Sequence, residues 1–149
     1  MGTPAENLAK SLDILRELQT GKGLETFRSR DITRTHRDRL IQNGFLKEVI
    51  KGWYILSRPD EKAGDSTIWY TSFWHFCSDY LNERFSDEWC LSPEQSISIH
   101  TGNWTVPNQL FVRSSRGNNN LIKLLFDTSI FDANLSIPPK KDIVVKDRI

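Results

Sequence analysis

The first third of the chain changes from helical to strand-like spacing of its apolar residues. Over residues 5–19 apolar side chains recur every three or four positions, which predicts an amphipathic helix that begins near Pro4. Gly21 and Gly23 are expected to end this helix. Residues 24–27 predict a short strand or turn, and residues 29–32 predict a short helix or turn.

A second helix is predicted over residues 34–43, with Thr33 as its N-cap and Gly44 directly after its end. Leu40 and Ile41 are expected to point inward, with two polar residues one turn earlier alongside them. These two residues are His36 and Arg37. The outward face is expected to carry Thr35, Asp38, Arg39 and Gln42, with Arg34 at the amino end.

A hairpin follows this helix. Residues 45–50 alternate as a strand, Lys51 and Gly52 predict a turn, and residues 53–56 predict the returning strand. Helix, turn, helix and hairpin in this order predict a winged helix-turn-helix over residues 1–58.

A polar stretch with proline and glycine, residues 58–65, predicts a boundary. A long helix is then expected from Ser66 or Thr67 to about Phe85, with its aromatic residues in a core. The rest predicts a short extended piece at 89–91, a helix from Ser92-Pro93 to about 100–102, and strands at 109–113, 121–126 and 129–135 around a turn at 116–120.

The predicted fold class is therefore α+β. Residues 66–138 are expected to form a small α+β subdomain, with a core helix and antiparallel strands. Residues 139–149 are expected to be a C-terminal tail or the start of a further region.

Charge is distributed unevenly along the 149 residues, although the formal net charge is only +1. Residues 28–58 carry eight Lys/Arg and three Asp/Glu, a net of +5, whereas residues 59–100 carry two and eight, a net of −6. Lysine and arginine neutralise phosphates, and a major groove admits one α-helix. A cationic helix before a hairpin therefore indicates a DNA-binding face, and a solvated surface with local charge clustering is the alternative.

The predicted partner is double-stranded DNA, and the candidate residues divide by chemistry. Side chains that can contact base edges are Thr35, Arg39 and Gln42. Cations that can hold phosphates are Arg34, Arg37, Lys47 and Lys51.

Motifs for catalysis or metal binding are missing from the sequence. Cys77 and Cys90 predict two reduced thiols, and His75 has no Cys-x-x-Cys pair with which to form a metal site. A nucleophile elbow and a phosphate-binding loop are also missing. We therefore expect no catalytic residue, metal or cofactor. Because the sequence has no apolar span and no signal-like start, we also expect a cytoplasmic protein that does not enter a membrane.

Two short motifs resemble the AbiEi-type antitoxins. The run from Leu40 to Leu56, with its basic-Gly-x-Tyr pattern at Lys51-Gly52-Trp53-Tyr54, resembles the N-terminal winged helix of that family. Residues 91–100 are similar to the Ser-x-x-Ser-Ala-x-x-x-His helix that follows there, with Ser96-Ile97 in place of Ser-Ala. This resemblance implies a DNA-binding antitoxin module.

Longer phrases resemble the region before the catalytic domain in some bacterial Fic (cell filamentation) proteins. They are residues 29–40, 51–55, 57–61 and 91–96. Fic enzymes transfer a nucleotide monophosphate to protein hydroxyls through a His-Pro-Phe-x-x-Gly-Asn-Gly-Arg loop, which this chain lacks; His100-Thr101-Gly102-Asn103 does not replace it. The resemblance therefore implies an accessory role without catalysis.

Three hypotheses follow. The first is a DNA-binding regulatory module of a toxin–antitoxin-like or Fic-associated system. The second is a non-catalytic protein-interaction or regulatory N-terminal domain of a Fic-type nucleotidyltransferase (protein AMPylation), with a Fic or toxin protein as partner. The third is the leading fragment of such an enzyme.

Overall fold

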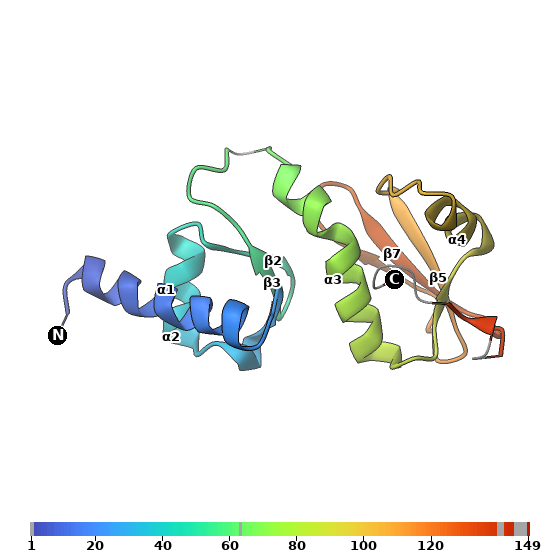
Figure 1. The fold of residues 1–149 in the computed structure, drawn as a ribbon, viewed down its shortest axis with the longest axis horizontal. Coiled ribbons are helices and arrows are strands. Elements are labelled where there is room, and N and C mark those ends of the chain that lie inside the picture. The colour runs from blue at the N-terminus through green and yellow to red at the C-terminus, as the bar shows by residue number, and fades with distance from the viewer. Residues whose placement is uncertain (1, 63, 140–141, 145–148) are drawn as a thin grey trace. The chain divides into compact units, whose positions relative to one another are not determined.

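The computed structural model describes residues 2–62, 64–139, 142–144 and 149 (Figure 1). The chain divides into two compact units, Met1–Ile68 and Trp69–Ile149, which we call the N-terminal unit and the C-terminal unit. Helices and two separate sheets make the fold α+β, as the sequence predicted.

The N-terminal unit combines helices with a three-stranded antiparallel sheet in the order β1-β3-β2. Its core contains Leu15, Leu18, Phe27, Ile32, Leu40, Leu46 and Tyr54. The elements are α1 (Pro4–Gly21), β1 (Thr26–Arg28), the 3-10 turn η1 (Ser29–Asp31), α2 (Arg34–Gln42), β2 (Leu46–Ile50) and β3 (Trp53–Leu56). The predicted helices and hairpin are therefore confirmed to within a few residues.

A capping box fixes the start of α1. Thr3 Oγ1 accepts a hydrogen bond from the Glu6 backbone N–H at 3.2 Å, and Glu6 Oε2 accepts one from the Thr3 N–H at 3.3 Å. Pro4 occupies the first turn, where its missing N–H costs nothing. These contacts fix Pro4 as the first residue of α1, where the helix was expected to begin.

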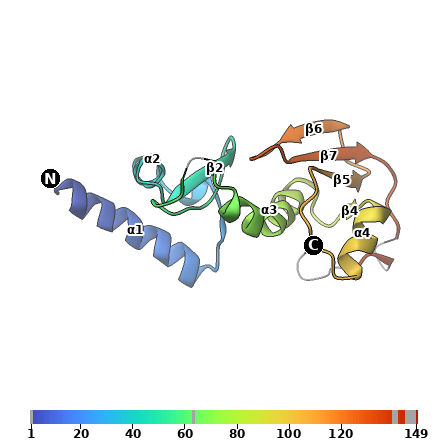
Figure 2. The same cartoon turned by 90° about the horizontal axis from the view of Figure 1, so that it is seen from above.

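The C-terminal unit packs one long helix against a four-stranded sheet in the order β4-β5-β7-β6 (Figures 1 and 2). Most of the buried large side chains of α3 are aromatic: Trp69, Phe73, Phe76, Tyr80 and Phe85. The elements are α3 (Thr67–Phe85), β4 (Cys90–Leu91), α4 (Pro93–His100), β5 (Gln109–Ser114), β6 (Asn120–Lys123) and β7 (Ser129–Asn134). The aromatic helix was predicted as core, and burial confirms this.

The expectation of purely antiparallel strands was wrong. β5 and β7 are parallel, in a register that pairs Phe111 with Phe131, while β4 pairs with β5 and β6 with β7 in antiparallel fashion. The last strand, β7, lies between β5 and β6. It is antiparallel to its hairpin partner β6 and parallel to β5.

Gly117 explains how the connection between β5 and β6 passes the end of β7. A Cβ at Gly117 would lie 2.7 Å from the carbonyl oxygen of Ala133 and 2.8 Å from that of Asp132. Contacts this short are closer than any side chain tolerates against backbone, so glycine is needed there.

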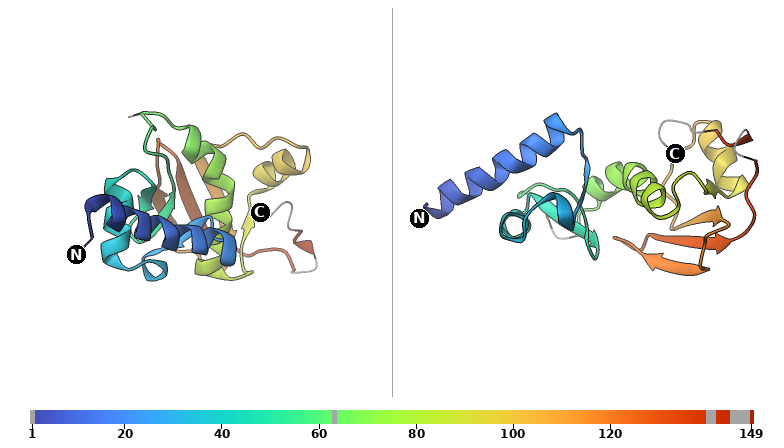
Figure 3. Two further views of the ribbon diagram at one scale, coloured as in Figure 1. Left: turned by 60° about the vertical axis from the view of Figure 1, so that its left-hand side comes forward. Right: turned by 90° about the horizontal axis from the view of Figure 1, so that it is seen from below.

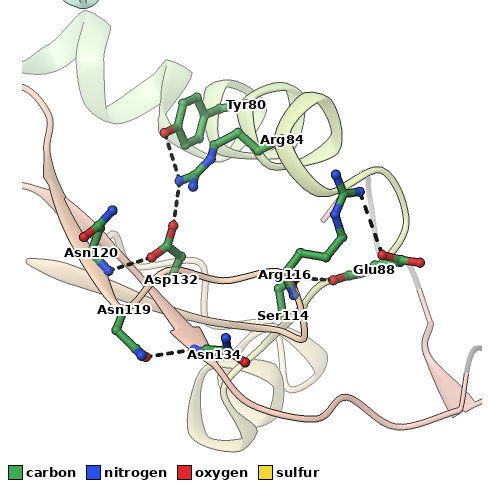
Figure 4. A network of polar contacts seen from close by, with 9 residues as sticks. All are labelled: Tyr80, Arg84, Glu88, Ser114, Arg116, Asn119, Asn120, Asp132 and Asn134. Atoms are coloured by element: carbon green, nitrogen blue, oxygen red, sulfur yellow. Dashed lines mark hydrogen bonds and ion pairs between the residues drawn. The ribbon is translucent and has the colours of Figure 1, made fainter.

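A buried ion pair joins α3 to β7 (Figure 4). Asp132 is fully buried; its Oδ2 lies 2.6 Å from Nη1 of Arg84, and its Oδ1 accepts a hydrogen bond from the Asn120 N–H at 2.8 Å. Arg84 Nη1 also donates to the Tyr80 hydroxyl at 3.3 Å. Burial acts to lower the pKa of Arg84, but Tyr80 and Asp132 outweigh it and raise that pKa above its usual value.

The connection between β6 and β7 is longer than the sequence indicated, because β6 ends at Lys123 rather than near Phe126. The Thr128 N–H donates to the Leu125 carbonyl at 3.1 Å, and both central residues have positive φ: 50° at Phe126 and 60° at Asp127. These values fit a type I′ turn, which favours glycine at its second central position.

Replacing Asp127 with glycine is expected to raise the free energy of unfolding by about 0.5 kcal/mol, because glycine adopts positive φ without steric cost. Urea titration followed by tryptophan fluorescence measures the change. Asp127→Ala is the control and should be destabilising, since alanine tolerates this conformation less well than aspartate. Equal stability of the glycine and alanine variants would contradict the turn geometry.

No helix in the described part of the chain is both long and apolar enough to cross a bilayer. Cys77 and Cys90 are free thiols, and burial raises the pKa of each, although the Arg113 charge partly opposes this at Cys90. Both thiols are therefore held in the protonated form. No group of three or more metal-ligating side chains occurs among the described residues.

Candidate nucleic-acid interface

One side of helix α2 packs into the core of the N-terminal unit, and the other side is exposed to solvent. Leu40 is fully buried in the core, whereas Thr35 and Gln42 are exposed seven residues apart and thus lie on the same side of the helix. Arg34, with 87% of its side chain exposed, stands in the first turn, 3.7 Å from Asp38. These three candidates lie where the sequence predicted them.

Arg39 does not lie on the open side, so its predicted orientation was wrong. It is half-buried, and its Nη1 donates to the Asn7 carbonyl at 3.2 Å and to Ser11 Oγ at 3.0 Å. Ser11 is fully buried, and its Oγ lies 2.8 Å from Nδ1 of His36. This polar cluster joins α2 to α1, which crosses it (Figure 3).

The small size of Ser11 explains the orientation of Arg39. Ser11 lies on the apolar side of α1, between Leu8 and Leu15 in the helical repeat, and leaves room for a long side chain from α2. A buried hydroxyl needs hydrogen-bond partners, and both Arg39 and His36 provide them. A serine within a leucine stripe was the signal in the sequence, and sequence reasoning missed it.

Arg37 also serves the fold. Its Nη1 donates to the carbonyl oxygens of Ser29, at 2.9 Å, and Ile32, at 3.1 Å, and so ties α2 to the 3-10 turn η1. The guanidinium lies 5.8 Å from the ring centre of Tyr54, within range of a cation–π contact. Arg37 therefore helps to set the position of α2 in the unit.

The two lysines of the hairpin differ in environment. Lys47 on β2 lies 3.8 Å from Glu61, whose side chain is only 8% exposed and whose Oε2 also accepts from Ser57 Oγ at 2.8 Å. Lys51 is exposed at the hairpin turn. Of the two, Lys51 has the environment expected of a phosphate-binding side chain.

The hairpin turn is braced by a residue that the sequence pattern did not single out. Arg28 Nε donates to the Gly52 carbonyl at 3.2 Å, and its guanidinium lies 4.2 Å from the ring centre of Trp53. The Ser29 N–H donates to the same carbonyl at 3.2 Å. Because β1 and η1 both hold Gly52, the backbone beside Lys51 is fixed.

Arg34, Thr35 and Gln42 on α2 and Lys51 at the hairpin turn are thus exposed, with Arg34 beside the exposed Asp38. Arg37, Arg39 and Lys47 are partly buried and contact carbonyls, a hydroxyl and a carboxylate of the unit itself. No family model, curated protein or solved structure matches the chain. Its function is therefore inferred from this geometry.

Proposed function

We propose that the N-terminal unit is a winged helix-turn-helix that binds double-stranded DNA, with α2 in the major groove and the β2–β3 hairpin as the wing. The observation that carries the proposal is the open side of α2, where Arg34, Thr35 and Gln42 project from a helix whose other side is buried. A helix held in this way can present the side chains of one face to base edges.

The start of α2 supports this proposal. Thr33 precedes the helix, but its side chain makes no capping hydrogen bond, so the first N–H groups of α2 have no side-chain cap. N–H groups at a helix start attract phosphate, and the exposed Arg34 adds a positive charge at the same place. The amino end of α2 is therefore suited to a DNA backbone.

We assign the candidate residues three kinds of role. Thr35 and Gln42 contact bases, and Arg34 and Lys51 contact phosphates. Arg37 and Arg39 act indirectly, because their hydrogen bonds to η1 and α1 hold α2 in place.

Removing the two open cations is expected to weaken DNA binding. Arg34→Ala/Lys51→Ala should lower affinity for a mixed-sequence duplex by at least about 10-fold at ~50 mM salt. It should also reduce the slope of log affinity against log salt by about 2, roughly one for each phosphate that is no longer neutralised. Fluorescence anisotropy between ~50 and ~200 mM salt measures both.

Lys10→Ala, on the exposed part of α1, is the matched control and should leave affinity and slope unchanged. The proposal fails if the native chain does not bind duplex at ~50 mM salt, or if its affinity does not respond to salt. A loss in the Lys10 variant half as large as that in the double variant would mean that binding depends on overall charge rather than on α2.

A regulatory role in a toxin–antitoxin-like or Fic-associated system remains a prediction from the sequence motifs. A second candidate function, a protein-interaction module, is favoured by an exposed apolar row on the C-terminal unit, formed by Phe111, Leu121 and their neighbour Phe131. The two functions are compatible, since they use different units of the chain.

A further inference from the structure

The sheet of the C-terminal unit has one covered face and one open face. Along β5, Leu110 and Val112 are fully buried, while Phe111 between them points to the opposite side. α3 packs on the covered side, where its Arg84 reaches Asp132, while among the described residues of this unit the start of α4 borders the other side next to Phe111. We call this other side the outer face.

Large apolar side chains form a row across the outer face. The register pairs Phe111 with Phe131 and Phe131 with Leu121, so the three lie side by side on three adjacent strands. The two phenyl rings stack with centroids 5.5 Å apart and planes 25° apart. Phe111 is 36% exposed, Leu121 is 52% exposed, and Leu135 just after β7 is 45% exposed.

Solvent-exposed aromatic and leucine side chains in contact with one another are uncommon on a monomer and mark interaction surfaces. A groove lined by Phe111, Leu135, Ser92, Pro93, Glu94 and Arg113 adjoins the row. The row therefore continues toward the start of α4 rather than ending at β5.

Opposite charges lie at the two ends of this row. Lys123 lies two residues after Leu121 on the edge strand β6, which places it on the same face. Glu94 lies beyond β5, at the start of α4, in the groove beside Phe111. Both are exposed, and neither has an ion-pair partner within the described residues.

This arrangement is complementary to itself. Two outer faces can meet around a two-fold axis that lies between them and runs parallel to the strands. The β4 edge of one copy then lies opposite the β6 edge of the other. Lys123 of one copy then faces Glu94 of the other, twice per pair of copies, while the apolar rows meet in the middle.

We propose that the outer face is a homodimer interface, in which two copies of this chain pack sheet to sheet. The strands of this sheet have six, six, four and two residues and lie ~4.8 Å apart, so they cover about 300 Å² on each copy, which is below the size of a standard specific interface. The dimer is therefore weak, with a dissociation constant on the order of 10 µM. The proposal is independent of DNA binding by the N-terminal unit.

Charge reversal tests the proposal by sedimentation velocity on the full chain from ~1 to ~300 µM. K123E and E94K each place like charges opposite one another in a homodimer and should weaken association at least ~10-fold. An equimolar mixture of the two variants restores opposite charges at both ends of the interface, and should associate as strongly as the native chain. The double variant K123E/E94K should also recover.

Leu121→Asp tests the apolar row, and it should abolish association without unfolding the chain, because Leu121 is half-exposed. Circular dichroism checks that each variant is folded, and Lys10→Glu on α1 is the control that should associate normally. A native chain that stays monomeric at ~300 µM overturns the proposal. So does full association of the Leu121 variant, or a mixture of K123E and E94K that remains as weak as its components.

Discussion

Replacing Arg84 with leucine is expected to lower the free energy of unfolding by about 3–5 kcal/mol. The Asp132 carboxylate is fully buried, and Arg84 at 2.6 Å is its ion-pair partner (Figure 4). Leucine fills much of the space but leaves a buried charge without compensation, and this costs more than the ion pair contributes. Urea titration followed by tryptophan fluorescence measures the loss, since four of the five tryptophans belong to the C-terminal unit.

The control for this prediction removes the charge as well as its partner. Asp132→Asn retains an oxygen that can accept from the Asn120 N–H, as Oδ1 of Asp132 does at 2.8 Å. The double variant Arg84→Leu/Asp132→Asn should therefore be more stable than Arg84→Leu alone, by about 2 kcal/mol. If the single variant lost less than about 1 kcal/mol, or the double variant were the less stable of the two, the buried charge would not be the cause.

Replacing Gly44 with alanine is expected to destabilise the N-terminal unit by about 2–4 kcal/mol. Gly44 follows α2 with φ of 83°, a conformation that costs a residue with a Cβ about 1 kcal/mol. An added Cβ would also lie 2.9 Å from Cα of Pro59, which is backbone and has little freedom to move. The strain and the contact together give the larger expected cost.

Gly23 separates the two contributions. Its φ is 66°, but an added Cβ would have no neighbour within 4 Å, so Gly23→Ala carries only the conformational cost of about 1 kcal/mol. Thermal unfolding followed by circular dichroism compares the variants. Equal losses at both positions would show that contact with Pro59 adds nothing, contrary to the expectation.

Local signals in the sequence located most elements well. Ser92 and Pro93 fixed the start of α4, where Ser92 Oγ accepts from the Gln95 N–H at 3.3 Å, and Lys51-Gly52 fixed the hairpin turn. Strand pairing was harder, because the alternation of β5 shows which residues face the core but not which strand lies alongside. The connection after β5 passes close to Ala133 at Gly117, and no local pattern reveals that β7 then pairs in parallel with β5.

The candidate site was predictable only in part, for a related reason. Arg34, Thr35 and Gln42 were placed correctly because helical periodicity decides which side they occupy. Arg39 was not, because its side chain is long enough to reach Ser11 on another helix. Periodicity gives the direction of a Cβ atom, whereas the end of an arginine goes where a neighbouring element offers acceptors.

The central position of β7 has a consequence for the order in which the chain folds. Domains generally fold as units during synthesis, and the N-terminal unit is complete once residue 68 has left the ribosome. The C-terminal sheet cannot form completely before residues 129–134 are made, because β5 and β6 do not pair with each other and are joined only through β7. A nascent chain stalled before residue 129 would therefore carry a folded first unit followed by strands that still lack their shared neighbour.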